Sequence, residues 1–373
     1  MSADVVVIGA GTVGAAIAYG LARRNVRVLV LDGGDRDFRA AAANFGLIWQ
    51  SGKGIDMPEY QTLTRASVDL WSEFGGELAE ITGTDLQYEH NGGLTICLGE
   101  AEFEQRRQLL HRLHNQPGSG TPDWEMIDRS ELAKLLPKVR LGAEVTGAGF
   151  GKRDGHANPL RLLAALHADI VRRGGELRGG ASVKTIQSDG HGGFVIDLGG
   201  ERISVGQVVI AAGLGSKTLG AQVGLDVPIH PLRGQILVTE RLDSFLPLPL
   251  SGLRQTREGT VMIGLTHEDA GFDSSTTAEA AAMLSANAIR RLPALAEVKL
   301  VRQWAGLRIM TPDGHPVYAE SQSHPGAFIA LCHSGITLAA VHADMLAQAI
   351  AVGRLPSSLD AFHQRRFDVP QAA

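Results

Sequence analysis

Short apolar runs recur along the chain, and most of them end in glycine or in a polar turn. The first two runs, at residues 4–8 and 25–31, are separated by small and apolar residues with helical spacing. Continuous apolar runs of this kind are typical of strands buried on both faces of a parallel sheet, in which helices connect successive strands. The N-terminal segment therefore predicts a strand, a helix and a second buried strand.

Strand and helix patterns continue to alternate through the rest of the chain. Asn158 and Pro159 predict the start of a helix that runs to about Arg173, because Asn favours the N-cap and Pro the first helical position. Further strands are predicted at 88–98, 176–186, 194–198, 207–213, 227–237, 259–265 and 327–331, and further helices at 100–114, 277–291 and 338–350. This order of elements indicates an α/β chain with a second, strand-rich part.

Length and composition narrow the class of protein. A chain of 373 residues exceeds the usual size of a single core, so two domains are expected. The 35 basic and 40 acidic residues form no sustained run of either sign, which argues against a nucleic acid or an anionic membrane as partner. Cys97 and Cys332 match no metal-ligand or redox spacing, and no apolar run approaches the length of a membrane span. We expect a cytoplasmic protein without a bound metal, a signal peptide or direct membrane insertion.

The turn between the first strand and the first helix carries Gly9, Gly11 and Gly14 in a Gly-x-Gly-x-x-Gly pattern. Such glycines permit a tight turn, close approach of a pyrophosphate, and close packing of the helix on the strand. Asp32 ends the second strand, where a carboxylate binds a ribose hydroxyl and disfavours a 2′-phosphate. The pattern predicts binding of a dinucleotide other than NADP, and a purely structural turn is the alternative.

Five further segments are motifs that, with the N-terminal turn, can be compared with known families. They are 154–159, 209–213, 231–235, 305–316 and 333–335. Together with the N-terminal turn, their order resembles that of FAD-dependent amine oxidoreductases of the D-amino-acid oxidase and glycine oxidase type, over nearly the whole chain. Residues 43–49 and 332–338 are most similar to the β subunits of opine oxidases and D-hydroxyproline dehydrogenases. The resemblance implies a Rossmann-like FAD-binding domain from 1–80, 150–218 and 325–373, and a strand-rich substrate-binding domain from 81–149 and 219–324.

The resemblance also implies how FAD is held. The ADP half is expected on Gly9, Gly11, Thr12, Val13, Gly14, Asp32 and Gly33, with the adenine beside Val183. The flavin is expected near Asn44, Phe45, Gly46, Leu47, Ala212 and Gly213, and its pyrimidine edge near His333, Ser334, Gly335, Ile336 and Thr337. A helix N-terminus at that edge favours the negative charge that develops on reduction. His333 could instead only cap the helix, and Asn44 could only shape the turn before Gly46. Residues 309–311 lack the cysteine of covalent relatives, so non-covalent FAD is expected.

Arg308 is the expected ligand of the substrate. In the glycine oxidase relatives, the arginine of the Gly-Leu-Arg motif clamps the substrate carboxylate, and its planar, permanently charged fork suits that task. An ion pair with Asp313 is the structural alternative. Residues 252–257 lack the tyrosine that these relatives use as a second ligand. Arg254 could replace it and His267 could line the pocket, although a surface position is the alternative for both.

The resemblance implies that the amine binds uncharged, loses a hydride to flavin N5 and becomes an imine, so no general base is assigned. The expected substrate is an α-amino acid such as D-hydroxyproline, D-proline or an opine. The expected role is that of the catalytic subunit in a heteromeric dehydrogenase whose partner subunits carry further redox cofactors. A peroxide-forming oxidase, a non-catalytic flavin-holding scaffold and a nicotinamide-dependent dehydrogenase are the alternatives. Arg308 argues against the scaffold, because a buried cation without a partner is costly.

Overall fold

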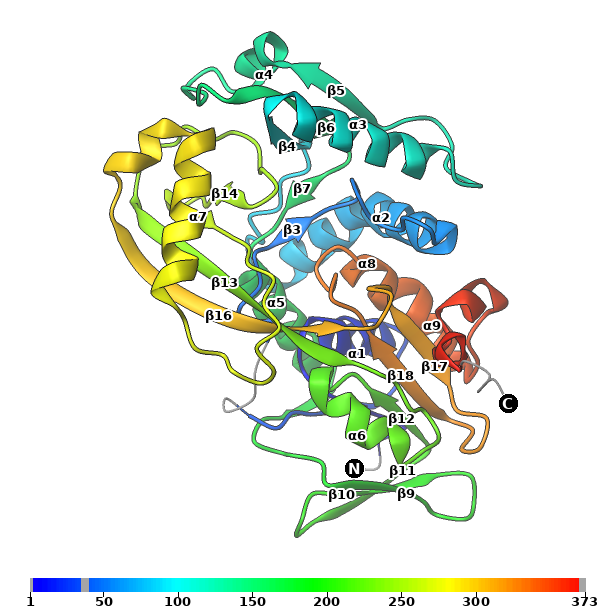
Figure 1. The fold of residues 1–373 in the computed structure, drawn as a ribbon. Helices are drawn as coiled ribbons and strands as arrows, with labels where there is room; N and C mark the ends of the chain where they lie inside the picture. The colour runs from blue at the N-terminus through cyan, green and yellow to red at the C-terminus, as the bar shows by residue number, and fades with distance from the viewer. Residues whose placement is uncertain (1–2, 35–39, 369–373) are drawn as a thin grey trace.

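A six-stranded sheet lies at the centre of one half of the computed structural model, which describes residues 3–34 and 40–368 (Figure 1). Its strands, in spatial order, are β17 (Val317–Glu320), β18 (Ala327–Leu331), β12 (Gln207–Ile210), β1 (Val5–Ile8), β2 (Val28–Leu31) and β8 (Glu176–Arg178). All neighbours pair in parallel except β17 and β18. The sheet thus has the parallel core expected of a doubly wound fold.

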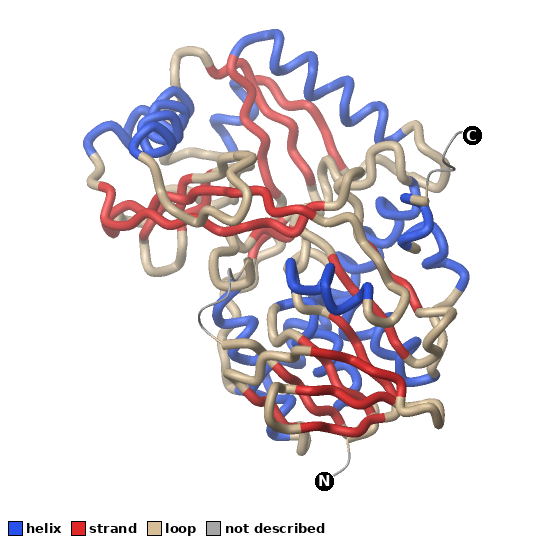
Figure 2. Tube along the Cα trace, turned by 60° about the horizontal axis from the view of Figure 1, so that its bottom comes forward, coloured by secondary structure: helices blue, strands red, loops and turns tan. Residues whose placement is uncertain are grey.

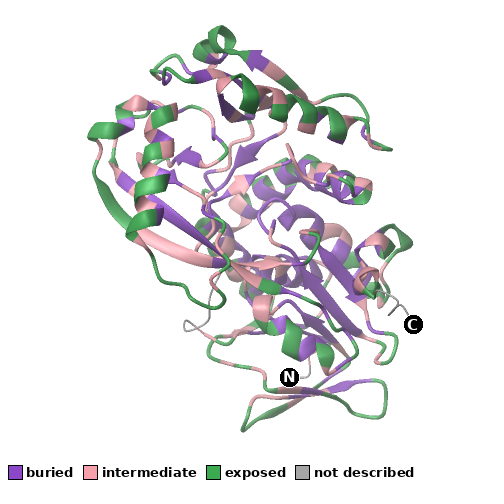
Figure 3. Cartoon of the chain, viewed as in Figure 1, coloured by how far each residue is buried: buried purple, intermediate pink, exposed green. Residues whose placement is uncertain are grey.

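Successive residues of β1 face two different hydrophobic cores, so the strand is buried throughout. Strand β18 of the same sheet is buried in the same way (Figure 3). Val5 and Val7 pack against helices, whereas Val6 and Ile8 face the opposite side. The helical side holds α1 (Thr12–Arg23), α2 (Pro58–Thr82), α5 (Pro159–Arg172) and the C-terminal run of α8 (Ala339–Val341), a π-helical turn (His342–Leu346) and α9 (Ala347–Val352). The other side holds α6 (Ser216–Ala221) and a small sheet of β9 (Thr185–Ser188), β10 (Phe194–Asp197) and β11 (Arg202–Val205). This double burial explains the uninterrupted apolar sequence.

The second half is built on antiparallel strands, and its helices lie outside them (Figure 2). One sheet has the order β14 (Leu253–Gln255), β15 (Thr260–Ile263), β13 (His230–Arg241) and β16 (Leu300–Met310). Another has the order β4 (Gly93–Leu98), β6 (Val145–Gly151) and β5 (Trp124–Asp128). The helices are α3 (Gly99–His114), α4 (Arg129–Leu135) and α7 (Ala278–Arg291). A shared core that includes Leu94, Leu237 and Leu284 joins these elements.

Shorter elements connect the two halves or finish the chain. The two-stranded pair of β3 (Leu47–Ile48) and β7 (Gly155–His156) lies between them, and 3₁₀ helices cover Gly213–Gly215, Pro293–Glu297, Ser357–Phe362 and Gln364–Phe367. Over the residues that are described, no helix has both the length and the apolar character needed to cross a membrane.

The α/β fold with a strand-rich second part is confirmed, and several boundaries differ from the prediction. The predicted strand 176–186 is wrong as one element, because Gly179 and Gly180 turn the chain and β8 and β9 enter different sheets. The predicted strand 88–98 begins only at Gly93, and the strand predicted at 227–237 runs as His230–Arg241. The domain boundaries given above stay a prediction.

Candidate active site

A cavity of about 930 Å³ lies between the two halves, at the carboxyl ends of the central parallel strands. Residues from the ends of β1, β2, β12 and β18 line one part of it, and residues of β13 and β16 line another. Ligands of open α/β sheets bind at this edge, because the loops that follow the strands leave a crevice there. The volume lies within the range of pockets for small molecules and cofactors.

The glycines of the first turn have different tasks. Gly9 has φ +107°, and a Cβ there would lie 2.7 Å from the carbonyl carbon of Ala211. A Cβ on Gly14 would overlap the Gly9 carbonyl, and Gly14 does not line the cavity. Gly11 does line it, and the nearest protein atom to a Cβ there would be Ala41 Cβ at 3.7 Å. Gly9 and Gly14 are therefore required by packing, whereas Gly11 leaves room for a ligand at the N-terminus of α1.

Two polar groups beside this turn suit a dinucleotide. The hydroxyl of Thr12 is buried and has no hydrogen-bond partner among the described residues, so it can bind a ligand oxygen. The Asp32 carboxylate lies at the cavity edge, where Oδ2 accepts from Ala10 N at 2.8 Å and Oδ1 from Gly34 N at 3.1 Å. Both backbone bonds orient the carboxylate between the glycine turn and the end of β2, where the ribose of the dinucleotide was expected.

The other expected cofactor residues gather around the same cavity. Its lining includes Val13, Gly33, Val183, Ala212, Gly213, Asn44, Phe45, Leu47, His333, Ser334, Gly335, Ile336 and Thr337. Gly46 is not part of the lining, but it shapes the turn that presents Phe45 and Leu47. It has φ +90°, and its backbone N–H donates a hydrogen bond to Asn44 Oδ1 at 2.8 Å. The segment 44–49 is bonded directly to the turn 333–337, because Trp49 N donates to Thr337 Oγ1 at 3.0 Å.

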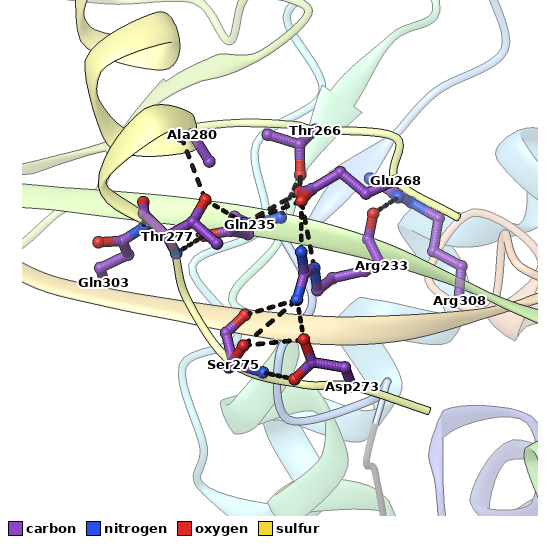
Figure 4. Close-up of polar contacts among 10 residues, drawn as sticks. All are labelled: Arg233, Gln235, Thr266, Glu268, Asp273, Ser275, Thr277, Ala280, Gln303 and Arg308. Atoms are coloured by element: carbon purple, nitrogen blue, oxygen red, sulfur yellow. Dashed lines mark hydrogen bonds and ion pairs between the residues drawn. The ribbon is translucent and has the colours of Figure 1, made fainter. Parts of the chain in front are cut away.

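Arg308, on β16, lines the cavity. Figure 4 shows its side chain beside the Arg233 carbonyl. Its Nη1 donates to the Arg233 carbonyl at 3.3 Å, and its buried Nη2 has no hydrogen-bond partner within 3–34 and 40–368. Burial lowers the pKa of this guanidinium. The alternative pairing with Asp313 is not formed, since Asp313 Oδ2 instead accepts from Arg366 Nε at 2.7 Å. Arg308 is thus a cavity cation with unused donors.

Arg254 lies elsewhere than expected. Its side chain is 2% exposed and does not line the cavity. Its Nε donates to the Phe45 carbonyl at 2.9 Å, and burial lowers its pKa to about 10. The structure therefore does not bring Arg254 to the substrate pocket, and its visible task is to support the loop that carries Phe45. His267, by contrast, lines the cavity from an exposed loop, and burial together with the charge of Arg308 lowers its pKa.

A polar network below this loop was not foreseen from the sequence (Figure 4). Arg233 donates to Glu268 Oε2 at 2.8 Å and to Asp273 Oδ2 at 2.6 Å, and Gln235 Nε2 donates to Glu268 Oε1 at 3.0 Å. Thr266 also donates to Glu268. The network fixes the segment that carries His267 and keeps the Glu268 carboxylate bound away from Arg308. The motif 231–235 contained Arg233 and Gln235, but their partners lie more than thirty residues later in the chain.

Lys53 is another cavity cation, besides Arg308 and Lys184, and the sequence did not single it out. Its Nζ lies 3.2 Å from His333 Nε2, and His333 Nδ1 lies 3.3 Å from Ser334 Oγ. The charge of Lys53, followed by burial, holds the pKa of His333 well below its usual value, so His333 is neutral. A lysine between two glycines, shortly after the predicted flavin-contacting segment, was the only sequence signal.

Comparison with known proteins shows the family of this chain. The family described as DAO, FAD dependent oxidoreductase, matches residues 4–349. The chain belongs to this family. Members that resemble it include the opine oxidase B subunits of Agrobacterium tumefaciens (strain Ach5), 41% identical over 99% of both chains, and of Rhizobium meliloti, 39% identical over 99% of both. The crystal structure of glycine oxidase from Geobacillus kaustophilus superimposes with a TM-score of 0.87 at 25% identity, covering 100% of this chain and 99% of that one.

Membership of the DAO family confirms the resemblance stated from the motifs, and it makes this protein an FAD-dependent oxidoreductase. FAD fits the residues present. Gly11 leaves a cradle that a side chain would fill, Thr12 offers a hydroxyl without a partner among the described residues, and the Asp32 carboxylate is fixed beside the glycine turn at the end of β2. These observations concern the part of the cavity beside the glycine turn. Arg308 and Lys53 line the same cavity, and Lys53 contacts His333.

Proposed function

We propose that this DAO-family enzyme oxidises an α-amino acid of the D-hydroxyproline, D-proline or opine type to the imine, with FAD bound non-covalently. One observation carries the proposal. The guanidinium of Arg308 enters the cavity that also contains the dinucleotide cradle, and its Nη2 lacks a partner among the described residues. A carboxylate satisfies such a fork with short, charge-assisted hydrogen bonds. An amino acid bound in this way would have its α-carbon near the flavin-contacting segment.

The residues of the chain contribute mainly orientation and charge. Arg308 fixes the carboxylate, and the cations around it disfavour a protonated amine, so the substrate amine binds in its uncharged form. FAD, when bound, supplies the acceptor for the hydride that leaves the carbon bearing the amine. Positioning alone can account for a large part of the rate enhancement in such a reaction. We assign no side chain as a general base.

We further propose that the protein acts as the catalytic subunit of a heteromeric dehydrogenase in the cytoplasm. The two opine oxidase relatives support the heteromer, because their names describe them as B subunits, and partners of the present chain would carry further redox cofactors. Cys97 and Cys332 are both free and buried, in keeping with a reducing compartment. The likeness to glycine oxidase favours a second candidate, a free-standing oxidase that produces hydrogen peroxide.

An anaerobic titration of the purified flavoprotein tests these proposals. D-hydroxyproline, D-proline, glycine, sarcosine and octopine are added in turn, and air is then admitted. Bleaching of the flavin absorbance followed by slow recovery supports the dehydrogenase, whereas rapid recovery with peroxide formation supports the oxidase. A flavin that no amine bleaches contradicts both proposals and favours a non-catalytic scaffold.

A further inference from the structure

The charges that face the cavity are unevenly distributed. Asp32, at the nucleotide end, is the only carboxylate among the lining residues that the structure describes. Lys184 lines the cavity beside Val183, and the two remaining lining cations, Lys53 and Arg308, are accompanied by the side chains of His267 and His333. Arg308 and Lys53 are close enough for the charge of Arg308 to lower the pKa of the Lys53 ammonium. Two like charges at one end of a cavity are unfavourable unless an anion is bound between or beside them.

Lys53 is held in place by its backbone rather than by a counter-ion. The preceding residues are fixed by the buried carboxylate of Asp154, whose Oδ1 accepts from Gln50 N at 2.6 Å and from Ser51 N at 3.0 Å. Lys53 N in turn donates to the Gln50 carbonyl at 3.0 Å. These bonds direct the side chain toward the turn at His333. The backbone of the loop therefore holds Lys53 in a position from which its side chain lines the cavity.

The ammonium of Lys53 retains unused hydrogen-bond donors. The described parts of the chain form no ion pair with it, and its one polar contact is the neutral ring of His333 at 3.2 Å. An ammonium has three N–H donors, so two are available to a ligand. Asp154, the carboxylate whose charge favours the protonated lysine, forms no ion pair with it; its Oδ1 accepts from two backbone amides, and its buried Oδ2 has no hydrogen-bond partner among the described residues. Desolvation lowers the pKa of Lys53 to about 8, as expected for a cation without a close counter-ion.

Arg308 also has a donor without a hydrogen-bond partner among the described residues, and a single carboxylate would accept from it. The nearest acidic side chain that acts on it is Glu268, and that carboxylate is bound by Arg233, Gln235 and Thr266. A substrate with one carboxylate would therefore neutralise Arg308 and leave Lys53 without a partner. A substrate with two carboxylates would neutralise both.

We propose that Lys53 binds the second carboxylate of an opine-type substrate, a secondary amine in which the nitrogen links two carboxylate-bearing carbon groups. This inference rests on the proposed function, because it assumes that Arg308 binds the carboxylate of the amino-acid part. It selects N-(carboxyalkyl) amino acids over cyclic imino acids with a single carboxylate. Lys53 then determines specificity, and His333 keeps its ammonium turned toward the site.

Binding of two unreactive ligands to the FAD-loaded enzyme tests the proposal without turnover. Thiodiacetate and methylthioacetate replace the amine nitrogen by sulfur and differ by one carboxylate. Calorimetry at pH 7 and low ionic strength should show thiodiacetate binding about tenfold or more tightly, the effect of one charge-assisted interaction. Equal affinity of the wild-type enzyme for both ligands would overturn the proposal, and this measurement needs no variant.

Variants of Lys53 assign the effect to its side chain. Lys53→Met should reduce the ratio of the two affinities to about one, and Lys53→Arg should preserve a preference for the dicarboxylate. Lys299→Met, which removes an exposed lysine outside the cavity lining, is the matched control and should keep the wild-type ratio. If Lys53→Met weakens both ligands equally, or leaves the ratio unchanged, the proposal is wrong. FAD content and thermal melting of each variant show whether it has folded.

The reaction itself separates this inference from the proposed function. Octopine and N-ethylarginine again differ by one carboxylate, and both are secondary amines. If both bleach the flavin at equal rates and bind equally, the enzyme oxidises amino acids but Lys53 has no such role. If neither bleaches it while thiodiacetate still binds preferentially through Lys53, the second anion site stands and the proposed oxidation is wrong.

Discussion

Gly234 on β13 leaves the space that the guanidinium of Arg308 on β16 occupies. A Cβ on Gly234 would lie 2.6 Å from Arg308 Cζ, so no larger residue permits this position of the side chain. The two strands pair from His230 opposite Met310 to Thr239 opposite Leu300. Within this pairing Gly234 lies opposite Gly306, and Leu232 lies opposite Arg308. The glycine of the Pro-Leu-Arg-Gly-Gln motif, Gly234, is thus explained by Arg308, which lies seventy-four residues later in the chain. The absence of a side chain at Gly234 lets the Arg308 side chain take this direction.

Gly234→Ala should therefore weaken substrate binding without unfolding the protein. Arg308 is flexible and can move away from the new methyl group, but it then loses its position in the cavity. We expect about a tenfold higher dissociation constant for thiodiacetate, with FAD content unchanged. Gly76→Ala is a suitable control, because a Cβ at Gly76 meets no atom within 4 Å. Unaltered ligand affinity in Gly234→Ala would show that Arg308 does not need this space.

Arg308→Lys tests the carboxylate clamp directly. Lysine retains the charge but replaces the two-pronged fork by a point charge, which removes one charge-assisted hydrogen bond. Such a bond contributes about 1.5–3 kcal/mol, so substrate binding should weaken roughly 10- to 100-fold. Flavin reduction should slow, while the protein stays yellow. Stopped-flow absorbance under anaerobic conditions measures both, and unchanged reduction kinetics would refute the assigned role.

Asp32→Ala should weaken FAD binding, because the carboxylate at the end of β2 is placed to accept hydrogen bonds from the ribose. Loss of such bonds to a charged group corresponds to about tenfold or more in affinity. The variant should release FAD on dilution, which the rise in flavin fluorescence reports. Asp32→Asn, which keeps an acceptor oxygen but not the charge, should lose less. Full retention of FAD by Asp32→Ala would contradict the assignment.

Arg233 should act on the substrate through Glu268. With Arg233→Met, the Glu268 carboxylate loses its main cation and becomes available to Arg308, where it competes with the substrate carboxylate. We expect KM for the amino acid to rise about tenfold with a smaller change in kcat, in line with the loss of one charge-assisted interaction. The double variant Arg233→Met/Glu268→Gln removes the competing charge and should recover most of the affinity. A merely structural loss would not be rescued in this way.

The sequence was sufficient to predict where locally encoded groups lie. The glycine turn and Asp32 follow each other within one strand–helix–strand unit, so their placement at the same cavity could be inferred from spacing alone. Arg254 illustrates the limit. Alternation along β14 indicates that it faces away from Leu253, but not that the loop around Phe45 covers that face. Lys53 was missed for the same reason. Its position in the cavity is recognised only from its contact with His333, which lies 280 residues later in the chain.

The break between β8 and β9 shows a related limit. Residues 176–186 have a strand-like composition apart from Gly179 and Gly180, and a pair of glycines is compatible with a bulge in one strand. The structure instead turns there, because β8 completes the edge of the central sheet while β9 belongs to the small sheet on its far side. The turn also brings Val183 to the cavity. Only tertiary packing decides between these two outcomes.

The pH dependence of ligand binding should reveal the charge of Lys53. Burial lowers its pKa to about 8 in the ligand-free protein, and a carboxylate binds the protonated form. Thiodiacetate affinity should therefore be full below pH 8 and fall by up to tenfold per pH unit above it, because a proton must then be taken up with the ligand. Methylthioacetate, held by Arg308, should bind with nearly constant affinity over the same interval, since arginine keeps its charge.

The other groups that face Lys53 do not titrate in this interval. The pKa of His333 lies well below its usual value, and burial also lowers that of His315. Burial raises the pKa of Asp154 to about 6 and that of Cys332 to about 12. A fall in thiodiacetate affinity above pH 8 can therefore be assigned to Lys53. Lys53→Arg should move the fall to higher pH, because the guanidinium remains protonated. Parallel pH profiles for the two ligands would instead show that the second carboxylate does not bind at Lys53.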